Sequence, residues 1–206
     1  MSGDEAVIHV VDDDRAAREG LGFMLGSLGL EVAPHGSAAD LLAKLDDNQR
    51  GCILADMRMP GMTGLELLDE LTRRGCPLPV IMITGHGDVP MAVRAIQAGA
   101  LDFFEKPVNG MALVERIRSA LELYDQRQAA AAGRNALAAR LASLTPREAE
   151  VARAVLAGRQ NKQIAAELGI SLKTVEIHRH NVMDKMGATG AADLVRMLIE
   201  GGWAEA

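Results

Sequence analysis

Polar residues at four places in the first half of the chain have the types and order of a phosphoryl-transfer site. A run of carboxylates, Asp12–Asp14, follows one short apolar segment, and Asp56, Thr84 and Lys106 each end or follow a later one. Clustered carboxylates repel one another unless a cation intervenes, and a site with few oxygen ligands suits Mg²⁺, which keeps several waters. A carboxylate beside Mg²⁺ can attack a phosphoryl donor, while the metal, an ammonium and a hydroxyl neutralise the aspartyl phosphate that results.

The segments around these residues predict an α/β domain. Five short apolar runs rich in Val and Ile, at residues 7–11, 30–33, 52–55, 80–83 and 101–104, alternate with helical segments at 15–28, 37–45, 64–74, 89–98 and 110–123. This alternation is typical of a five-stranded, doubly wound parallel sheet covered on both faces. In such a sheet, ligands bind at the carboxyl ends of the strands, where all four polar positions are expected to meet.

The composition changes after the fifth unit. Residues 124–143 are rich in Ala, Gln and Arg, with Gly133 the one strong helix breaker. The Ala content favours a helical linker that extends the preceding helix, while Gly133 leaves open whether that helix is unbroken. We therefore expect a first domain at residues 1–123, a linker at 124–143 and a second domain at 144–206.

The last part of the chain predicts a small all-α domain of four helices. Thr145-Pro146-Arg147-Glu148 combines an N-cap Thr, Pro at the first helical position and Glu at the third. This helix is expected to end at Gly158, and further helices are expected at 161–168, 171–186 and 191–200. The second and third are joined by a short turn containing Gly169, which is the arrangement of a helix-turn-helix.

The third of these helices has two different faces. Val175, Val182 and Met186 share one stripe, which should be buried. Ile177 lies on the opposite face among polar residues, and an isolated exposed Ile suggests contact with a base methyl group. The other residues expected on that face are Lys173, His180 and Asp184.

Charge and cysteine content limit the class of protein. The formal charge of -6 argues against a chain wholly dedicated to nucleic acid. The charge is uneven, however: residues 146–206 carry 8 basic and 8 acidic residues, so that part is neutral and a nucleic-acid role is allowed there. Cys52 and Cys76 form neither a disulfide framework nor a zinc quartet, and are expected to be free thiols. Since neither a secretory signal nor a membrane span is recognisable, we expect a cytoplasmic protein without membrane contact.

The first domain resembles the receiver domain of response regulators. The resemblance runs through the whole domain and includes Asp56-Met57-Arg58-Met59-Pro60-Gly61 and Glu105-Lys106-Pro107. It implies that Asp56 is the phosphoacceptor, that Lys106 pairs with the phosphoryl group and that Thr84 moves to bond it. The implied ligands of Mg²⁺ are Asp13 directly, Asp12 through water, Asp56, and the backbone carbonyl of Arg58.

The same resemblance gives roles to residues near the fifth strand. Phe103 falls at the aromatic switch position, whose ring turns inward when Thr84 shifts. Phe104 is next to it on the strand and therefore faces the other side, where ordinary packing is expected. Pro107 is expected to follow a cis peptide bond, and Asp14 to cap the first helix. Arg58 and His86 are candidates for tuning slow self-dephosphorylation.

The second domain resembles the LuxR-type DNA-binding domain through Leu144–Glu148, Asn161–Ala165 and Ser171–His178. With a receiver ahead of it, the whole chain resembles the FixJ-type branch of the NarL/LuxR response regulators, and the segment Thr84–Pro90 is especially similar to that branch. We expect base contacts from Glu176, Ile177 and His180, and phosphate contacts from Lys162, Lys173, Thr174 and Arg179. In this family the last helix mediates dimerisation, which makes Ala192, Val195 and Arg196 candidate interface residues, although core packing explains Val195 equally well.

The resemblance implies a transcription factor that is controlled by phosphorylation, rather than a metabolic enzyme. A sensor histidine kinase would phosphorylate Asp56, two receivers would then pair, and the homodimer would bind double-stranded promoter DNA and activate transcription with RNA polymerase. Self-phosphorylation with Mg²⁺ and slow self-dephosphorylation are the only reactions expected. Two alternatives remain: a metal-dependent phosphatase, in which the nucleophile would follow the first strand, and a constitutive DNA-binding protein with a vestigial receiver, which would have lost a pocket residue.

Overall fold

The computed structural model describes residues 6–46, 49–85 and 89–203, and divides into two compact units, residues 1–128 and 129–206. Among the described residues, none of the helices combines the length and apolar character that a membrane span requires.

The first unit is built on a five-stranded sheet in the order β2-β1-β3-β4-β5, and every strand pair is parallel. The strands are β1 (Val7–Val11), β2 (Glu31–His35), β3 (Gly51–Asp56), β4 (Val80–Thr84) and β5 (Asp102–Glu105). The helices are α1 (Arg15–Ser27), α2 (Ala38–Lys44), α3 (Gly64–Arg73), α4 (Val89–Gln97) and α5 (Gly110–Ala142). Helix α5 continues into the second unit. The prediction of a doubly wound parallel sheet is confirmed.

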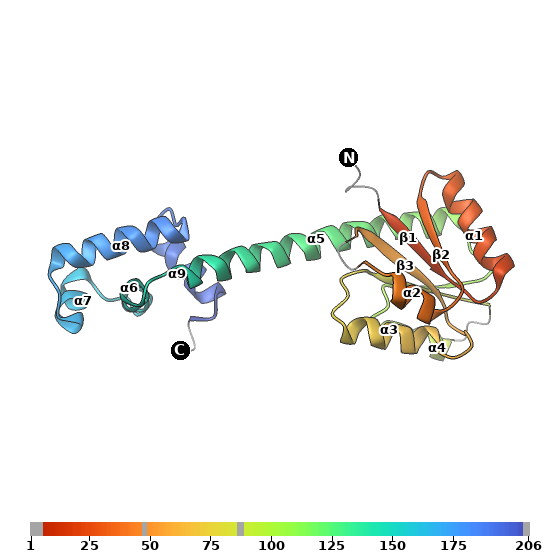
Figure 1. Cartoon of the computed structure of the whole chain (residues 1–206), viewed down its shortest axis with the longest axis horizontal. Helices are drawn as coiled ribbons and strands as arrows, with labels where there is room; N and C mark the ends of the chain where they lie inside the picture. The colour runs from red at the N-terminus through yellow and green to blue at the C-terminus, as the bar shows by residue number, and fades with distance from the viewer. Residues whose placement is uncertain (1–5, 47–48, 86–88, 204–206) are drawn as a thin grey trace. The chain divides into compact units, whose positions relative to one another are not determined.

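Helices cover both faces of this sheet (Figure 1). On one face, α2, α3 and α4 pack over a cluster that contains Val11, Ile53 and Met82. On the other face, α1 and α5 pack over Ile8, Leu54 and Ile81. Because both faces are buried, the central strands are mostly apolar rather than alternating, with His9 of β1 as an internal exception and polar residues at the ends of β3 and β4.

The largest difference from the predicted elements of this sheet is at β2. The sequence predicted a strand at residues 30–33, whereas β2 runs from Glu31 to His35 and includes Pro34. Proline lacks the backbone N–H that a central strand needs, but β2 lies at the edge of the sheet, where one side of the strand has no neighbour. The strand therefore continues through Pro34 to His35, two residues beyond the predicted end at Ala33.

Helix α5 contains residues 124–142 of the segment 124–143 that the sequence predicted as a helical linker. It runs without interruption from Gly110 to Ala142 and passes through Gly133. A glycine inside a helix costs about 1 kcal/mol relative to alanine, and the neighbouring run of alanines and long side chains offsets this cost. The predicted helical linker is confirmed.

The second unit adds four short helices after α5: α6 (Pro146–Leu156), α7 (Asn161–Leu168), α8 (Leu172–Met186) and α9 (Ala191–Glu200). Their apolar sides form one core, centred on Val151, Ile164, Val175 and Leu198. Thr145 and Glu148 form a reciprocal capping box at the start of α6, as predicted. Helix α6 ends two residues before Gly158, and Ser171 is the N-cap of α8 rather than its first residue.

Candidate functional site

The parallel sheet brings four polar residues together at the carboxyl ends of its strands. Asp12 follows β1, Asp56 ends β3, Thr84 ends β4 and Lys106 follows β5. Asp12, Asp56 and Thr84 are almost completely buried, at 2%, 8% and 1% exposure, and they are among the few buried polar residues of the unit. We call Asp12, Asp56, Thr84 and Lys106, together with the neighbouring Asp13, the acidic pocket. Buried carboxylates require compensation, so this end of the sheet is a candidate for charge chemistry.

Lys106 lies between the two buried carboxylates. Its Nζ is 2.6 Å from Asp12 Oδ2 and 2.7 Å from Asp56 Oδ1. Burial lowers the pKa of Lys106, but the hydrogen bonds to Asp12 and Asp56 outweigh it and raise that pKa above its ordinary value. One ammonium thus serves two carboxylates, and a net negative charge remains that a cation could neutralise.

Backbone amides and one arginine orient the carboxylates. The second oxygen of Asp56 accepts a hydrogen bond from the Arg58 amide at 2.7 Å. Asp12 Oδ1 accepts one from the Asp14 amide at 2.9 Å, and its backbone carbonyl accepts a hydrogen bond from the Arg18 guanidinium. Both side chains are therefore held in place at this end of the sheet before any ligand arrives.

The donor chemistry of this pocket fits Mg²⁺. Asp13 is exposed beside the buried Asp12, and Arg58, whose amide donates to Asp56, lies in the loop that follows β3. Within the described ranges, no group of three or more His, Cys, Asp or Glu side chains is arranged as a metal site. Mg²⁺ does not require such a cage, because it commonly binds one or two carboxylates and keeps several waters.

The residues in and after β5 have the predicted backbone and packing arrangement. Lys106 and Pro107 are joined by a cis peptide bond, as predicted, and the Lys106 amide donates to the Thr84 carbonyl at 2.7 Å. Phe103 and Phe104 pack against opposite faces of the sheet, which confirms the predicted alternation. Phe103 is half-buried. His86 lies outside the described residues.

Helix α8 presents the predicted two faces. Val175, Val182 and Met186 are buried at 0%, 1% and 0% exposure. Ile177 is 52% exposed on the other side. The remaining exposed residues of that side are Lys173, Glu176, His180 and Asp184. This face is a candidate DNA-binding surface because it combines donors, acceptors and an apolar group on one helix.

Two of the predicted phosphate contacts already have partners within the unit. The Arg179 guanidinium donates to Asn161 Oδ1 at the start of α7, at 2.8 Å. The hydroxyl of Thr174 lies 2.8 Å from that of Ser171, the N-cap of α8. Lys162 and Lys173 are both exposed, and neither pairs with a carboxylate of the described residues. These two lysines are therefore the more available for phosphate.

Sequence reasoning missed three contacts that position these sites. Arg18 holds the carbonyl of Asp12, Arg147 donates to the Leu168 carbonyl at the end of α7, at 2.7 Å, and Lys185 pairs with the buried Glu148 at 2.6 Å. Each pair joins residues of different elements or of a helix and a loop. The helical period alone gives no signal for such pairs, because it reports which side of a helix is apolar and not which polar groups meet.

Comparisons with known proteins agree with both units. Residues 8–118 match the model of the response regulator receiver domain, and residues 142–198 match that of the luxR family of bacterial regulatory proteins. The chain is 47% identical over 199 residues to the transcriptional regulatory protein FixJ of Azorhizobium caulinodans, covering 97% of this chain and 94% of the relative. It is 48% identical to the C4-dicarboxylate transport transcriptional regulatory protein DctR of Rhodobacter capsulatus, over 92% of this chain and 98% of that protein.

Solved structures of whole regulators are also similar to this chain. The response regulator StyR has a TM-score of 0.86 and 42% identity, over 95% of this chain and 99% of its own. Full-length FixJ from B. japonicum has a TM-score of 0.57 and 41% identity, over 96% of this chain and 98% of its own. The similarity thus extends over both units rather than the receiver alone.

Proposed function

This chain belongs to the response regulators of two-component systems that join a receiver domain to a LuxR-type DNA-binding domain, and from that premise we propose that phosphorylation of Asp56 controls its binding to promoter DNA. A sensor kinase is the partner that a receiver implies, and DNA is the partner that the LuxR-type domain implies. The domain limits that we propose are 1–123 and 144–206, with residues 124–143 as the connecting helix.

The proposed chemistry is transfer of a phosphoryl group to Asp56. A carboxylate oxygen of Asp56 attacks the phosphorus of the kinase phosphohistidine, the P–N bond breaks, and the electron pair stays on the histidine nitrogen. Asp12, Asp13, Asp56 and the Arg58 carbonyl would hold Mg²⁺, which when bound supplies positive charge beside the reacting oxygens. The Arg58 amide and the Lys106 ammonium, each of which donates to one oxygen of Asp56, would orient the carboxylate for this attack.

Lys106 and Thr84 would stabilise the product. The Lys106 ammonium already lies 2.7 Å from Asp56, so a phosphoryl group on that carboxylate comes within reach of it. Thr84 is buried at the end of the neighbouring strand and supplies a hydroxyl. We propose that movement of Thr84 allows Phe103 to turn inward, and that this changes the face formed by α4, β5 and α5.

That face supports a proposal of phosphorylation-dependent dimerisation. Val89, Val93 and Ile96 of α4 are 77%, 47% and 48% exposed, and Met111 of α5 is 69% exposed. Exposed apolar groups gathered on one helix are typical of interaction surfaces. Pairing through the receivers would bring two DNA-binding units together.

Pairing matters because one DNA-binding unit has little net charge. Residues 146–206 have equal numbers of acidic and basic residues, so a single unit gains little from general attraction to phosphates. Linking two units raises the effective concentration of the second at its half-site. We propose that α8 enters the major groove, that Glu176, Ile177 and His180 contact bases, and that Lys162, Lys173, Thr174 and Arg179 contact phosphates. We further propose that the dimer activates transcription with RNA polymerase.

The observation that carries this proposal is the pairing of Lys106 with Asp12 and Asp56 at the carboxyl ends of the strands. The test is sedimentation velocity of the full chain with and without acetyl phosphate and Mg²⁺. Wild type should shift from monomer to dimer, and Asp56→Asn should not. Asp69→Asn, which changes an exposed carboxylate on α3, is the matched control and should behave as wild type. Dimerisation of Asp56→Asn equal to that of wild type would contradict the proposal.

A further inference from the structure

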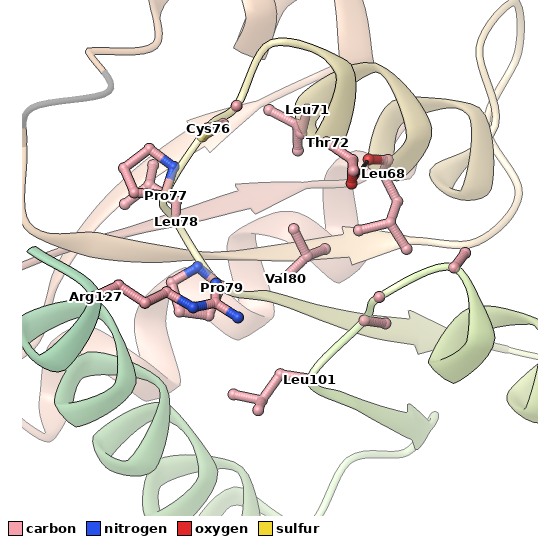
Figure 2. A pocket seen from close by; sticks show the side chains of 14 residues that line it. Leu68, Leu71, Thr72, Cys76, Pro77, Leu78, Pro79, Val80, Leu101 and Arg127 are labelled. Carbon is pink, nitrogen blue, oxygen red and sulfur yellow. Dashed lines mark hydrogen bonds between the residues drawn. The ribbon is translucent and has the colours of Figure 1, made fainter. Parts of the chain in front are cut away.

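A pocket of about 500 Å³ opens on the receiver unit at the amino-terminal ends of β4 and β5, whereas the acidic pocket lies at the carboxyl ends of the strands. Val80, the first residue of β4, and Leu101, which precedes β5, line it together with residues from the end of α3 and from α5. Figure 2 shows Leu68 and Leu71 on the α3 side of Val80, Leu101 on the other side of Val80, and the Arg127 side chain extending from α5 toward Pro79. Its volume is within the range of about 300–1,000 Å³ that small-molecule sites occupy.

The walls of the pocket are held by the protein itself. The turn after α3 is closed by a hydrogen bond from the Cys76 amide to the Leu71 carbonyl, at 3.0 Å, and the Leu101 amide donates to the Val80 carbonyl at 2.7 Å. Pro77 and Pro79 restrict the segment between them. Because these walls do not need a ligand to form, a ligand would bind without ordering the chain.

Arg127 is the single charged side chain among the described residues that line this pocket. It makes no hydrogen bond or ion pair within the described part of the chain, whereas the nearby Asp125 is held by two hydrogen bonds of 2.8 Å from Arg50. The guanidinium therefore has its donors available at the pocket. A planar guanidinium pairs best with a carboxylate, which it can bind through two hydrogen bonds.

We propose that this pocket binds a small-molecule carboxylate with an apolar body. The body lies against the leucine, valine and proline side chains, and the carboxylate pairs with Arg127. Aromatic or aliphatic monocarboxylates have this chemistry, whereas neutral alcohols and amines lack the charge that Arg127 complements. The site is separate from the phosphorylation site, and its occupation does not depend on the proposed function.

The two cysteines provide a local reporter. Cys76 lines the pocket and is partly exposed, whereas Cys52 is fully buried in β3, where burial raises the pKa of its thiol to about 12. Neither forms a disulfide. Alkylation of Cys76 therefore reports access to the pocket, and Cys52 is an internal control that stays unreactive while the unit is folded.

The test is titration of the full, unphosphorylated chain with octanoate. Binding is measured by isothermal titration calorimetry. In a separate experiment, the rate at which iodoacetamide alkylates Cys76 is measured by peptide mass spectrometry. Octanoate should bind with a Kd below about 1 mM and slow the alkylation of Cys76. Octanol and octylamine at the same concentrations should bind at least about tenfold more weakly, since each lacks the charged hydrogen bond.

Two variants of α5 separate the pocket from the general charge of the helix. Arg127→Gln should weaken octanoate binding about tenfold, and Arg118→Gln, which changes an exposed arginine away from the pocket, should leave it unchanged. Absence of both binding heat and protection of Cys76 would overturn the proposal. Equal binding of octanol, or octanoate binding by Arg127→Gln equal to that of wild type, would also overturn it.

Discussion

Replacement of Lys185 by methionine should destabilise the DNA-binding unit, because it removes the partner of a buried carboxylate. The Lys185 Nζ lies 2.6 Å from Glu148 Oε2 and 3.1 Å from the Ser143 carbonyl. The Glu148 side chain is only 5% exposed, so it has little access to water when the ammonium is lost. This pair joins α8, the candidate DNA-binding helix, to the start of α6.

The pKa of Glu148 gives the size of the effect. The hydrogen bond from Lys185, followed by that from the Thr145 amide, lowers the pKa of this carboxyl from 4.5 to about 2. A difference of that size corresponds to at most about 3 kcal/mol of stability. Because Lys185 is one-third exposed, solvent screens the pair, and the Thr145 amide remains in the variant. We therefore expect Lys185→Met to lose about 2 kcal/mol.

The dependence on pH has a definite sign. The pKa of Glu148 is lower in the folded chain than in the unfolded chain, so its contribution is fully present above pH 4.5 and is lost as the pH falls toward about 2. The difference between Lys185→Met and wild type should therefore be constant near neutral pH and narrow below pH 4.5.

Trp203 makes this measurement specific to one unit. It is the single tryptophan of the chain, it packs against the core of the second unit, and the Arg153 guanidinium lies 4.8 Å from its ring centroid. Urea unfolding followed by tryptophan fluorescence therefore reports that unit. Arg159→Met is the control, because its pair with Glu167 is exposed and longer, at 3.4 Å, and should contribute less than about 1 kcal/mol. Equal unfolding midpoints for the two variants would refute the reasoning.

Three further predictions follow from single contacts. Burial and, to a smaller extent, repulsion from His35 lower the pKa of His9 from 6.5 to about 4. The stability of the receiver unit should therefore decrease as the pH falls from 6.5 toward 4. NMR titration of the His9 ring should give a midpoint near 4 rather than 6.5. Arg147→Met should lower the stability of the second unit by about 1 kcal/mol, measured by Trp203 fluorescence, because the Leu168 carbonyl loses its donor, and an unchanged midpoint would argue against that role. Ile177→Ala should weaken specific DNA binding by about 1–3 kcal/mol without changing the salt dependence of binding, whereas Lys173→Ala should reduce that salt dependence. Fluorescence anisotropy at several salt concentrations distinguishes the two variants. Identical salt slopes for both would contradict the assignment of Ile177 to a base and Lys173 to a phosphate.

The features predicted well from the sequence are those that depend on local patterns. The apolar runs predicted the positions of all five strands along the chain, most clearly for β1, β3 and β4, because a strand buried on both faces needs mostly apolar residues. The start of α6 was predictable because Thr145, Pro146 and Glu148 satisfy the free backbone groups of a helix end by their spacing alone. The buried stripe of α8 followed from the helical period in the same way.

The features that escaped prediction depend on contacts between distant segments. Pro34 is tolerated because β2 is at the sheet edge, and the sequence does not say which strand lies there. His9 and His35 lie 26 residues apart and meet at 3.1 Å because β1 and β2 pair in register. The partners of Arg18, Arg147 and Lys185 also depend on packing. For the acidic pocket, the residue types indicated the chemistry, but only the fold places Lys106 between Asp12 and Asp56.

The most direct test of the central claim is intact-protein mass spectrometry after incubation with acetyl phosphate and Mg²⁺. Wild type should gain the mass of one phosphoryl group, the gain should require Mg²⁺, and it should be absent from Asp56→Asn. Failure of wild type to gain that mass, under conditions that phosphorylate another receiver domain, would contradict the account, as would an equal gain by Asp56→Asn.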